Sequence, residues 1–104
     1  MRSAILLAAA AGLAIAQAKP DVSKGNEVFD EQCSGCHYAD REDRKVGPSL
    51  KWLFVKDKLD SNGKPVSEKT VLQVLNGGGK GMPSFQKTLS DQDRADLLAY
   101  LKTL

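Results

Sequence analysis

Two cysteines and one histidine lie within five consecutive positions of this chain. Cys33 and Cys36 are its only cysteines, and His37, which follows directly, is its only histidine. The pattern Cys-x-x-Cys-His is typical of covalent haem attachment, in which each thiol adds to one vinyl group of the porphyrin as a thioether. Two intervening residues let one helical turn reach both vinyl groups, and the adjacent imidazole can bind the iron as a neutral nitrogen ligand. The sequence therefore predicts one haem c per chain, held by Cys33 and Cys36, with iron bound by His37.

Three other uses of a close cysteine pair fit the rest of the sequence less well. A structural zinc site takes four ligands, and the chain has neither a second cysteine pair nor a second histidine. A redox-active dithiol normally lies at a strand-to-helix junction of a βαβ unit, and no strand pattern precedes Cys33. A disulfide between Cys33 and Cys36 would close a very short loop and stabilise the fold little. Thiol redox chemistry is the main alternative to haem attachment.

The opposite face of such an iron needs a second ligand or stays open, and Met82 is the best candidate. It is the only methionine besides Met1, and it lies in a Lys-Gly-Met-Pro loop. The glycine lets the backbone approach the porphyrin, and the proline favours an extended conformation at Met82. A thioether is a soft, neutral ligand that favours ferrous iron and raises the potential. The alternatives are that Met82 only fills a gap in the core, or that Lys80 or Lys87 binds the iron.

The first eighteen residues have the features of a secretory signal peptide. Arg2 supplies a positive charge, and an apolar run from Ala4 to Ala16 is interrupted only by Gly12. Ala16-Gln17-Ala18 has the small-x-small pattern of a cleavage site. The apolar run is shorter than the roughly 20 residues that a membrane-spanning helix needs. We expect residues 1–18 to be a cleaved signal peptide and 19–104 to form one domain; an uncleaved anchor or a buried helix is the alternative.

The balance of charged and apolar residues excludes one class of partner. The formal charge of the chain is +2, and because residues 1–18 hold Arg2 and no acid, the remainder carries 14 basic and 13 acidic side chains. Nucleic acid binding needs a concentrated cationic face, so we expect no nucleic-acid partner. About a third of residues 19–104 are apolar, and a core in so short a domain supplies only about 3–5 kcal/mol. We therefore expect a cofactor to fill part of the interior.

Helix signals dominate this domain, and no alternating strand pattern is present. The first helix is expected to begin at Asp21 or Ser23, both common capping residues. Gly25, Phe29 and Cys33 recur at four-residue spacing and so share one face. A glycine inside a helix costs about 1 kcal/mol relative to alanine, which indicates close approach by another helix. The later segments expected are a loop at 38–48, an apolar turn or short helix at 49–54, a turn at 60–65, a helix capped by Ser67 and ended by 76–79, and a last helix capped by Ser90.

With these residues identified, the segment 19–104 resembles a class I cytochrome c, that is, a short bacterial monohaem c-type cytochrome. The attachment motif is specific for covalent haem, and four weaker motifs stand in the order expected for this family. The resemblance implies an all-α, small cytochrome c fold, with three to four helices wrapped around one covalently attached haem. The four motifs are Gly25 with Phe29, Val46-Gly47-Pro48-Ser49-Leu50, Gly81-Met82-Pro83-Ser84-Phe85, and a Leu-Ser-Asp … Leu-Ala-Tyr-Leu ending that begins at Leu89.

The resemblance also implies particular contacts. Pro48 would pack beside the imidazole of His37, and the neighbouring carbonyl would orient the imidazole N–H. Family members often place a tryptophan near the haem propionates; Trp52 is either such a residue or a partly buried aromatic. The N- and C-terminal helices of the family cross, and the residues expected to meet there are Gly25, Phe29, Leu97 and Tyr100.

The expected function is single-electron transfer. An iron with both axial positions filled by side chains binds no substrate. The haem would therefore cycle between Fe(III) and Fe(II) and carry single electrons from one respiratory or oxidoreductase partner to another. No acid, base and nucleophile constellation accompanies the motif, so we expect an electron-transfer protein and not an enzyme. We expect a monomer in the periplasm. After cleavage of the signal it would have no stable membrane insertion, whereas a chain that keeps the signal would be anchored in the membrane. Two other classes stay open: a haem protein that binds a small ligand, which needs Met82 off the iron, and a subunit permanently docked to an oxidoreductase.

Overall fold

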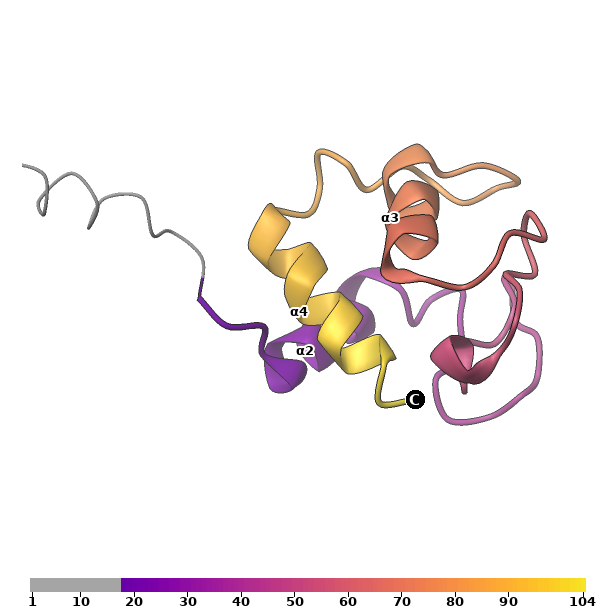
Figure 1. Ribbon diagram of the computed structural model, residues 1–104, viewed down its shortest axis with the longest axis horizontal. Coiled ribbons are helices and arrows are strands. Elements are labelled where there is room, and N and C mark those ends of the chain that lie inside the picture. Colours follow the sequence, from indigo (N-terminus) through magenta and orange to yellow (C-terminus); the bar gives the residue numbers. More distant parts are fainter. Residues whose placement is uncertain (1–17) are drawn as a thin grey trace, which may run out of the picture.

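The computed structural model describes residues 18–104. The signal peptide expected at residues 1–18 lies outside the described residues, apart from Ala18. Within residues 18–104, β-structure is limited to two isolated bridges, so the predicted all-α fold is confirmed. No helix in this part of the chain combines the length and the apolar character needed to cross a membrane. The elements in chain order are α2 (Val22–Gln32), the short 3-10 helix η1 (Leu53–Val55), α3 (Glu68–Gly77) and α4 (Asp91–Leu101) (Figure 1).

The helices α2, α3 and α4 begin at capping side chains that the sequence suggested, with Asp21 and not Ser23 capping α2. Asp21 caps α2 by accepting a hydrogen bond from the backbone N of Lys24 at 3.1 Å. Ser67 and Ser90 cap α3 and α4, and in both helices the third helical residue returns a bond to the backbone of the cap. These reciprocal pairs satisfy donors that the first helical turn leaves unpaired. The helix starts therefore follow from local side-chain chemistry.

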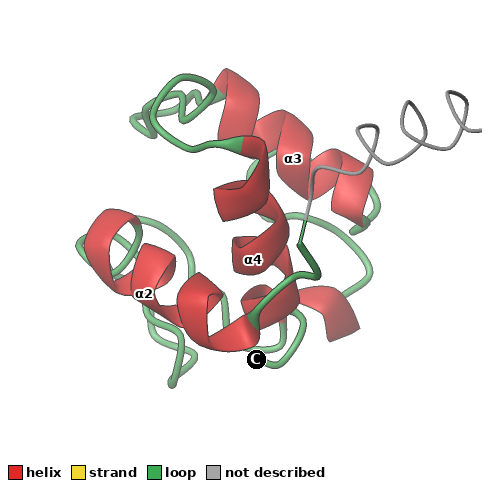
Figure 2. Ribbon diagram, turned by 90° about the vertical axis from the view of Figure 1, so that its left-hand side faces the viewer, coloured by secondary structure: helices red, strands yellow, loops and turns green. Residues whose placement is uncertain are grey.

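The N- and C-terminal helices cross at a glycine, as the resemblance implied. A Cβ built on Gly25 would come within 1.9 Å of the carbonyl oxygen of Asp96 in α4. One turn later, the rings of Phe29 and Tyr100 pack at 5.6 Å between centroids and a 52° tilt. Figure 2 shows α4 between α2 and α3. The helix α2 leads into the cysteine motif, and α3 precedes Met82.

A buried carboxylate on α4 accepts a hydrogen bond from the backbone at the N-terminus of α2. The side chain of Asp96 is only 3% exposed. Its Oδ1 accepts hydrogen bonds from the backbone N of Asp21 at 2.8 Å and from Nε2 of Gln92 at 3.1 Å. An anion beside a helix N-terminus is favourable because the free N–H groups there carry partial positive charge. This contact fixes the register of α4 against α2.

Four of the eleven buried apolar residues in the described part of the chain lie outside the helices. Only Phe29 of α2 is a buried large apolar residue, whereas the loops before and after α3 bury Leu59, Phe85 and Leu89. Loop residues that are this buried must have fixed positions. The remaining buried apolar residues are Cys33, Leu53, Val71, Leu75, Leu97, Leu98 and Leu101.

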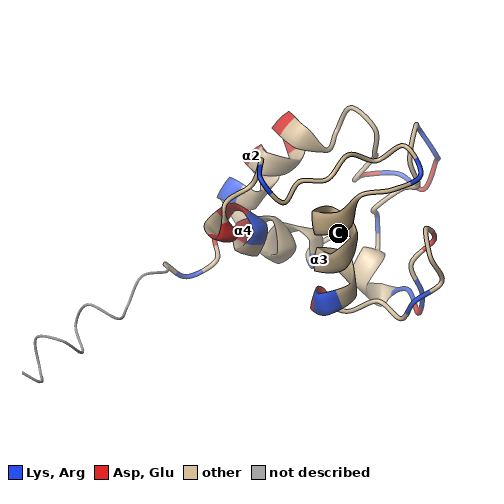
Figure 3. Cartoon of the chain, turned by 90° about the horizontal axis from the view of Figure 1, so that it is seen from above, with Lys and Arg blue, Asp and Glu red and all other residues tan. Residues whose placement is uncertain are grey.

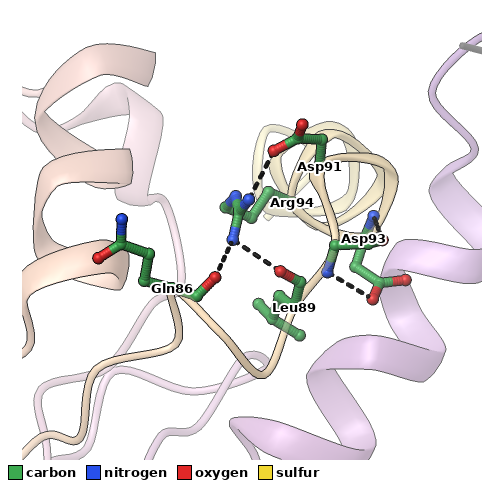
Figure 4. Close-up of polar contacts among 6 residues, drawn as sticks. Gln86, Leu89, Asp91, Asp93 and Arg94 are labelled. Carbon is green, nitrogen blue, oxygen red and sulfur yellow. Dashed lines mark hydrogen bonds and ion pairs between the residues drawn. The ribbon is translucent and has the colours of Figure 1, made fainter.

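An arginine holds the segment between Met82 and α4 in place. Nη1 of Arg94 donates to the carbonyl oxygens of Leu89 at 2.7 Å and of Gln86 at 3.2 Å (Figure 4). Its Nη2 lies 2.6 Å from Oδ1 of Asp91, and the Arg94 side chain is only 14% exposed. The guanidinium therefore satisfies two carbonyls at the entry to α4 and fixes the chain leading away from Met82.

Candidate functional site

The Cys-x-x-Cys-His motif forms a tight turn at the C-terminal end of α2. Cys33 directly follows the last helical residue and caps the C-terminus of α2, where its backbone N donates to the carbonyl of Phe29 at 2.8 Å. The carbonyl of Cys33 then accepts from the backbone N of Cys36 at 3.1 Å and of His37 at 3.0 Å. A single turn thus holds both thiols and the imidazole, as the spacing indicated.

The two thiols have different surroundings. The Cys33 side chain belongs to the hydrophobic core, whereas Cys36 is exposed, and neither forms a disulfide. Burial, with a smaller contribution from Cys36, raises the pKa of the Cys33 thiol from 9.0 to about 11. Reactive dithiols lie at helix N-termini and have lowered pKa values. Because this pair follows a helix C-terminus, where the dipole opposes negative charge, the geometry disfavours thiol redox chemistry.

The imidazole of His37 is held in one orientation by the residues of the Gly-Pro sequence. Its Nδ1 lies 2.7 Å from the carbonyl oxygen of Pro48. Since a carbonyl only accepts, Nδ1 carries the hydrogen, and Nε2 is left with a free lone pair for a metal. A Cβ on Gly47 would come within 2.5 Å of Cε1 of this ring. Glycine at position 47 is therefore needed for the ring to occupy its place, a constraint that sequence reasoning missed.

The loop between the motif and η1 is closed by its own hydrogen bonds. The backbone N of Gly47 donates to the carbonyl of Cys36 at 2.7 Å, and that of Leu50 donates to the carbonyl of Tyr38 at 2.9 Å. The buried hydroxyl of Ser49 donates to the carbonyl of Arg41. These bonds return the chain to the motif, and so they bring the Pro48 carbonyl to His37 although eleven positions separate the two residues.

Met82 lies at the end of a two-residue turn that follows α3. The backbone groups of Gly79 and Met82 pair in both directions, at 2.8 and 3.0 Å. The two residues between them, Lys80 and Gly81, have φ angles of 53° and 88°. This left-handed conformation is what two-residue hairpin turns require, and it explains Gly81 without any close approach to a ligand. The Met82 side chain is half-buried and packs against the core.

The base of the Met82 loop is anchored to the end of α3. Gly78, with a φ of 65°, ends the helix, and a Cβ there would come within 2.6 Å of the Met82 carbonyl oxygen. The backbone N of Phe85 donates to the carbonyl of Leu75 at 2.7 Å, and the Ser84 hydroxyl donates to the carbonyl of Asn76 at 2.6 Å. The glycines and the buried Phe85 together give the loop one conformation.

Trp52 has an unusual backbone conformation. Its φ of 61° lies in the left-handed region, which large side chains rarely adopt. The side chain is 44% exposed, and the ammonium of Lys51 lies 4.5 Å from the ring centroid. The ring is thus a partly exposed aromatic with a cation over its face. A propionate contact of Trp52 stays a hypothesis.

Positions of both charge signs are spread along the described chain (Figure 3). Arg41 lies 3.9 Å from both Asp40 and Asp43. Lys102, at the end of α4, pairs with Glu68 at the start of α3. Opposite charges at this spacing partly neutralise one another, so these pairs add little to any long-range field.

The chain is similar to known proteins over most of its length. The family model described as cytochrome c matches residues 22–104. A cytochrome c from Tetrahymena pyriformis is 32% identical over 99 residues, covering 81% of this chain and 89% of the relative. A cytochrome c6 from Leptolyngbya boryana is 35% identical over 81 residues, covering 78% and 89%. The crystal structure of cytochrome c6 from the diatom Phaeodactylum tricornutum superimposes with a TM-score of 0.61 at 28% identity, covering 80% of this chain and 92% of that one.

Proposed function

Because this chain belongs to the cytochrome c family, we propose that it carries one haem c, attached through Cys33 and Cys36, with iron bound by His37 and Met82. Members of this family are haem-based electron carriers and not enzymes. This chain is likewise a haem-based electron carrier. The finer assignment names the residues that hold the group, the compartment and the kind of partner.

The residues of the site fit a covalently attached haem. Cys33 and Cys36 lie on one turn and are both free thiols, as two thioether bonds need. Hydrogen bonding of His37 Nδ1 to Pro48 leaves Nε2 as the only ring nitrogen able to bind iron. Met82 supplies a neutral thioether from a loop with a fixed backbone. When bound, the haem supplies a one-electron Fe(III)/Fe(II) couple.

The protein's contribution is to hold these ligands still. The Pro48 carbonyl fixes the tautomer and the plane of the imidazole, and it increases the basicity of Nε2. The anchored base of the Met82 loop keeps the thioether available without a change of fold. A site whose ligands stay in place in both oxidation states suits electron transfer, whereas a site that binds oxygen needs an open position.

We propose that the carrier works in the periplasm, after removal of residues 1–18. The first structural role in the described chain belongs to Asp21, whose side chain caps α2 and whose backbone bonds to Asp96. A cut after Ala18 leaves α2, α3 and α4 intact, which supports a mature protein that begins at Lys19. Its donor and acceptor are redox proteins, to which it binds as a monomer.

One observation carries the ligand assignment: the only histidine of the chain lies in the turn that holds both cysteines, with Nδ1 occupied and Nε2 free. A redox titration of the purified protein, followed by its visible spectrum, tests it. We expect a c-type spectrum with one haem per chain, a single one-electron transition, and the weak near-red band of methionine-bound ferric haem. A ferric protein that lacks this band would show that Met82 is not the ligand. If the ferrous protein also binds carbon monoxide readily, it is a ligand-binding haem protein instead.

A further inference from the structure

The side chain of Lys80 links the turn that carries Met82 to another segment of the chain through a hydrogen bond. Lys80 stands at the tip of the two-residue turn, and its ammonium donates to the carbonyl oxygen of Ser61 at 2.9 Å. Among the described residues, no other hydrogen bond joins residues 79–82 to a different segment. Lys80 also adopts a φ of 53°, a conformation that glycine adopts more readily than lysine. A lysine at this position therefore calls for a reason beyond the turn itself.

Ser61 belongs to a segment with its own fixed structure. Residues 58–65 form a short hairpin that is closed by a bridge between Lys58 and Pro65. The backbone N of Gly63 donates to the carbonyl of Leu59 at 2.9 Å. The backbone N of Leu59 donates to the carbonyl of Lys64, also at 2.9 Å. Leu59 is buried in the core, which attaches the hairpin to the body of the protein. The Ser61 carbonyl is thus a stationary acceptor.

The two kinds of anchor restrain different parts of the loop. The bonds to Leu75 and Asn76 fix the base of the loop on α3, on the side that follows Met82. The Lys80 bond fixes the tip, on the side that precedes it. A turn held at both points has fewer conformations in which the Met82 side chain swings away, because the tip cannot lift without breaking a charge-assisted hydrogen bond.

We propose that Lys80 is a positioning residue, which holds the turn that carries Met82 against the 58–65 hairpin and so sets how strongly Met82 competes with external ligands for the iron. The proposal rests on the proposed function, since it takes Met82 as the iron ligand. Loss of the bond shifts the balance between a state with Met82 on the iron and a state with Met82 off it. An external ligand that binds only the second state measures this balance.

The experiment compares imidazole affinity of the ferric holoprotein in four variants by visible spectroscopy. Lys80→Gln removes the ammonium, and Lys80→Arg keeps a cationic donor at the same position. Lys64→Gln is the charge control, because it removes one positive charge from the 58–65 hairpin that carries Ser61. No hydrogen bond or ion pair of the Lys64 side chain is seen within residues 18–104. Met82→Ala reports the affinity with the competing ligand removed.

We expect imidazole to bind about two- to fivefold more tightly to Lys80→Gln than to the wild type, the lower range of the net contribution of one hydrogen bond, because this bond is exposed. Lys80→Arg and Lys64→Gln should match the wild type. Equal affinity of Lys80→Gln and Lys64→Gln would overturn the proposal, because the effect would then be one of charge alone or absent.

Two further readouts separate this proposal from its premise. Met82→Ala should bind imidazole far more tightly than any lysine variant; if its affinity equals that of the wild type, Met82 is not the ligand and the proposed function fails first. If Met82→Ala responds and Lys80→Gln does not, only the role of Lys80 is refuted. Amide hydrogen exchange should also accelerate at Gly79 and Met82 in Lys80→Gln, since their mutual bonds close the turn, and unchanged exchange there would contradict the proposal.

Discussion

Replacing Gly25 with alanine is expected to force α2 and α4 apart. The new Cβ would lie 1.9 Å from the carbonyl oxygen of Asp96 and 2.8 Å from Cβ of Tyr100, whereas ordinary contact begins near 3.4 Å. The nearest atoms belong to the backbone of α4, so no rotamer change can relieve the clash. Overpacking of this kind costs about 3 kcal/mol at the upper end of its usual range, and the better helix propensity of alanine returns about 1 kcal/mol. The free energy of unfolding should fall by about 2 kcal/mol, which lowers the melting temperature of so small a domain by about 8–16 °C.

Guanidinium denaturation of the holoprotein measures this change, and Gly77→Ala is the matched control. Gly77 is also helical, but a Cβ there would meet nothing within 4 Å, and its φ is not positive. Alanine at position 77 should therefore stabilise the protein by about 0.5–1 kcal/mol. If the two variants shift the denaturation midpoint equally, the crossing of α2 and α4 does not depend on Gly25, and the packing argument is refuted.

The remaining predictions concern the haem and the processing of the chain. Met82→Ala should lower the redox potential and let ferrous haem bind carbon monoxide, because no second thioether is available in residues 19–104; a wild-type potential together with exclusion of carbon monoxide would show that Met82 is not a ligand. Acid–acetone extraction should leave the colour on the protein if Cys33 and Cys36 both carry thioether bonds, and extracted colour would contradict covalent attachment. The intact mass of the exported protein should correspond to a chain that starts at Lys19, whereas recovery of Met1 in a membrane fraction would favour a retained anchor.

Local chemistry explains why much of the fold could be predicted. Asp21, Ser67 and Ser90 begin the helices because each side chain bonds a backbone N–H only three residues away. The glycines after α3 end that helix by adopting conformations that other residues rarely adopt, a property of the residue type alone. Such signals act within one helical turn, so the sequence contains them in full.

For the candidate site, the sequence predicted which residues take part but not how they are oriented. The Cys-x-x-Cys-His spacing, the single histidine and the one methionine outside residues 1–18 are properties of the sequence, and they named the four candidate haem residues. The bond from His37 to the Pro48 carbonyl was expected only through the family resemblance, since nothing in the spacing of the two residues indicates it. The residues of the site were thus predicted by type, and their orientation was not.

The tertiary structure alone decided the contacts that hold these ligands. Asp96 bonds the backbone of Asp21 from 75 positions away, and the ammonium of Lys80 bonds Ser61 across 19 positions. Partners so distant in sequence meet only once the helices have packed and the loops have closed. Which charged side chain becomes a buried cap or a tether therefore depends on the shape of the folded core, and sequence spacing carries no information about it.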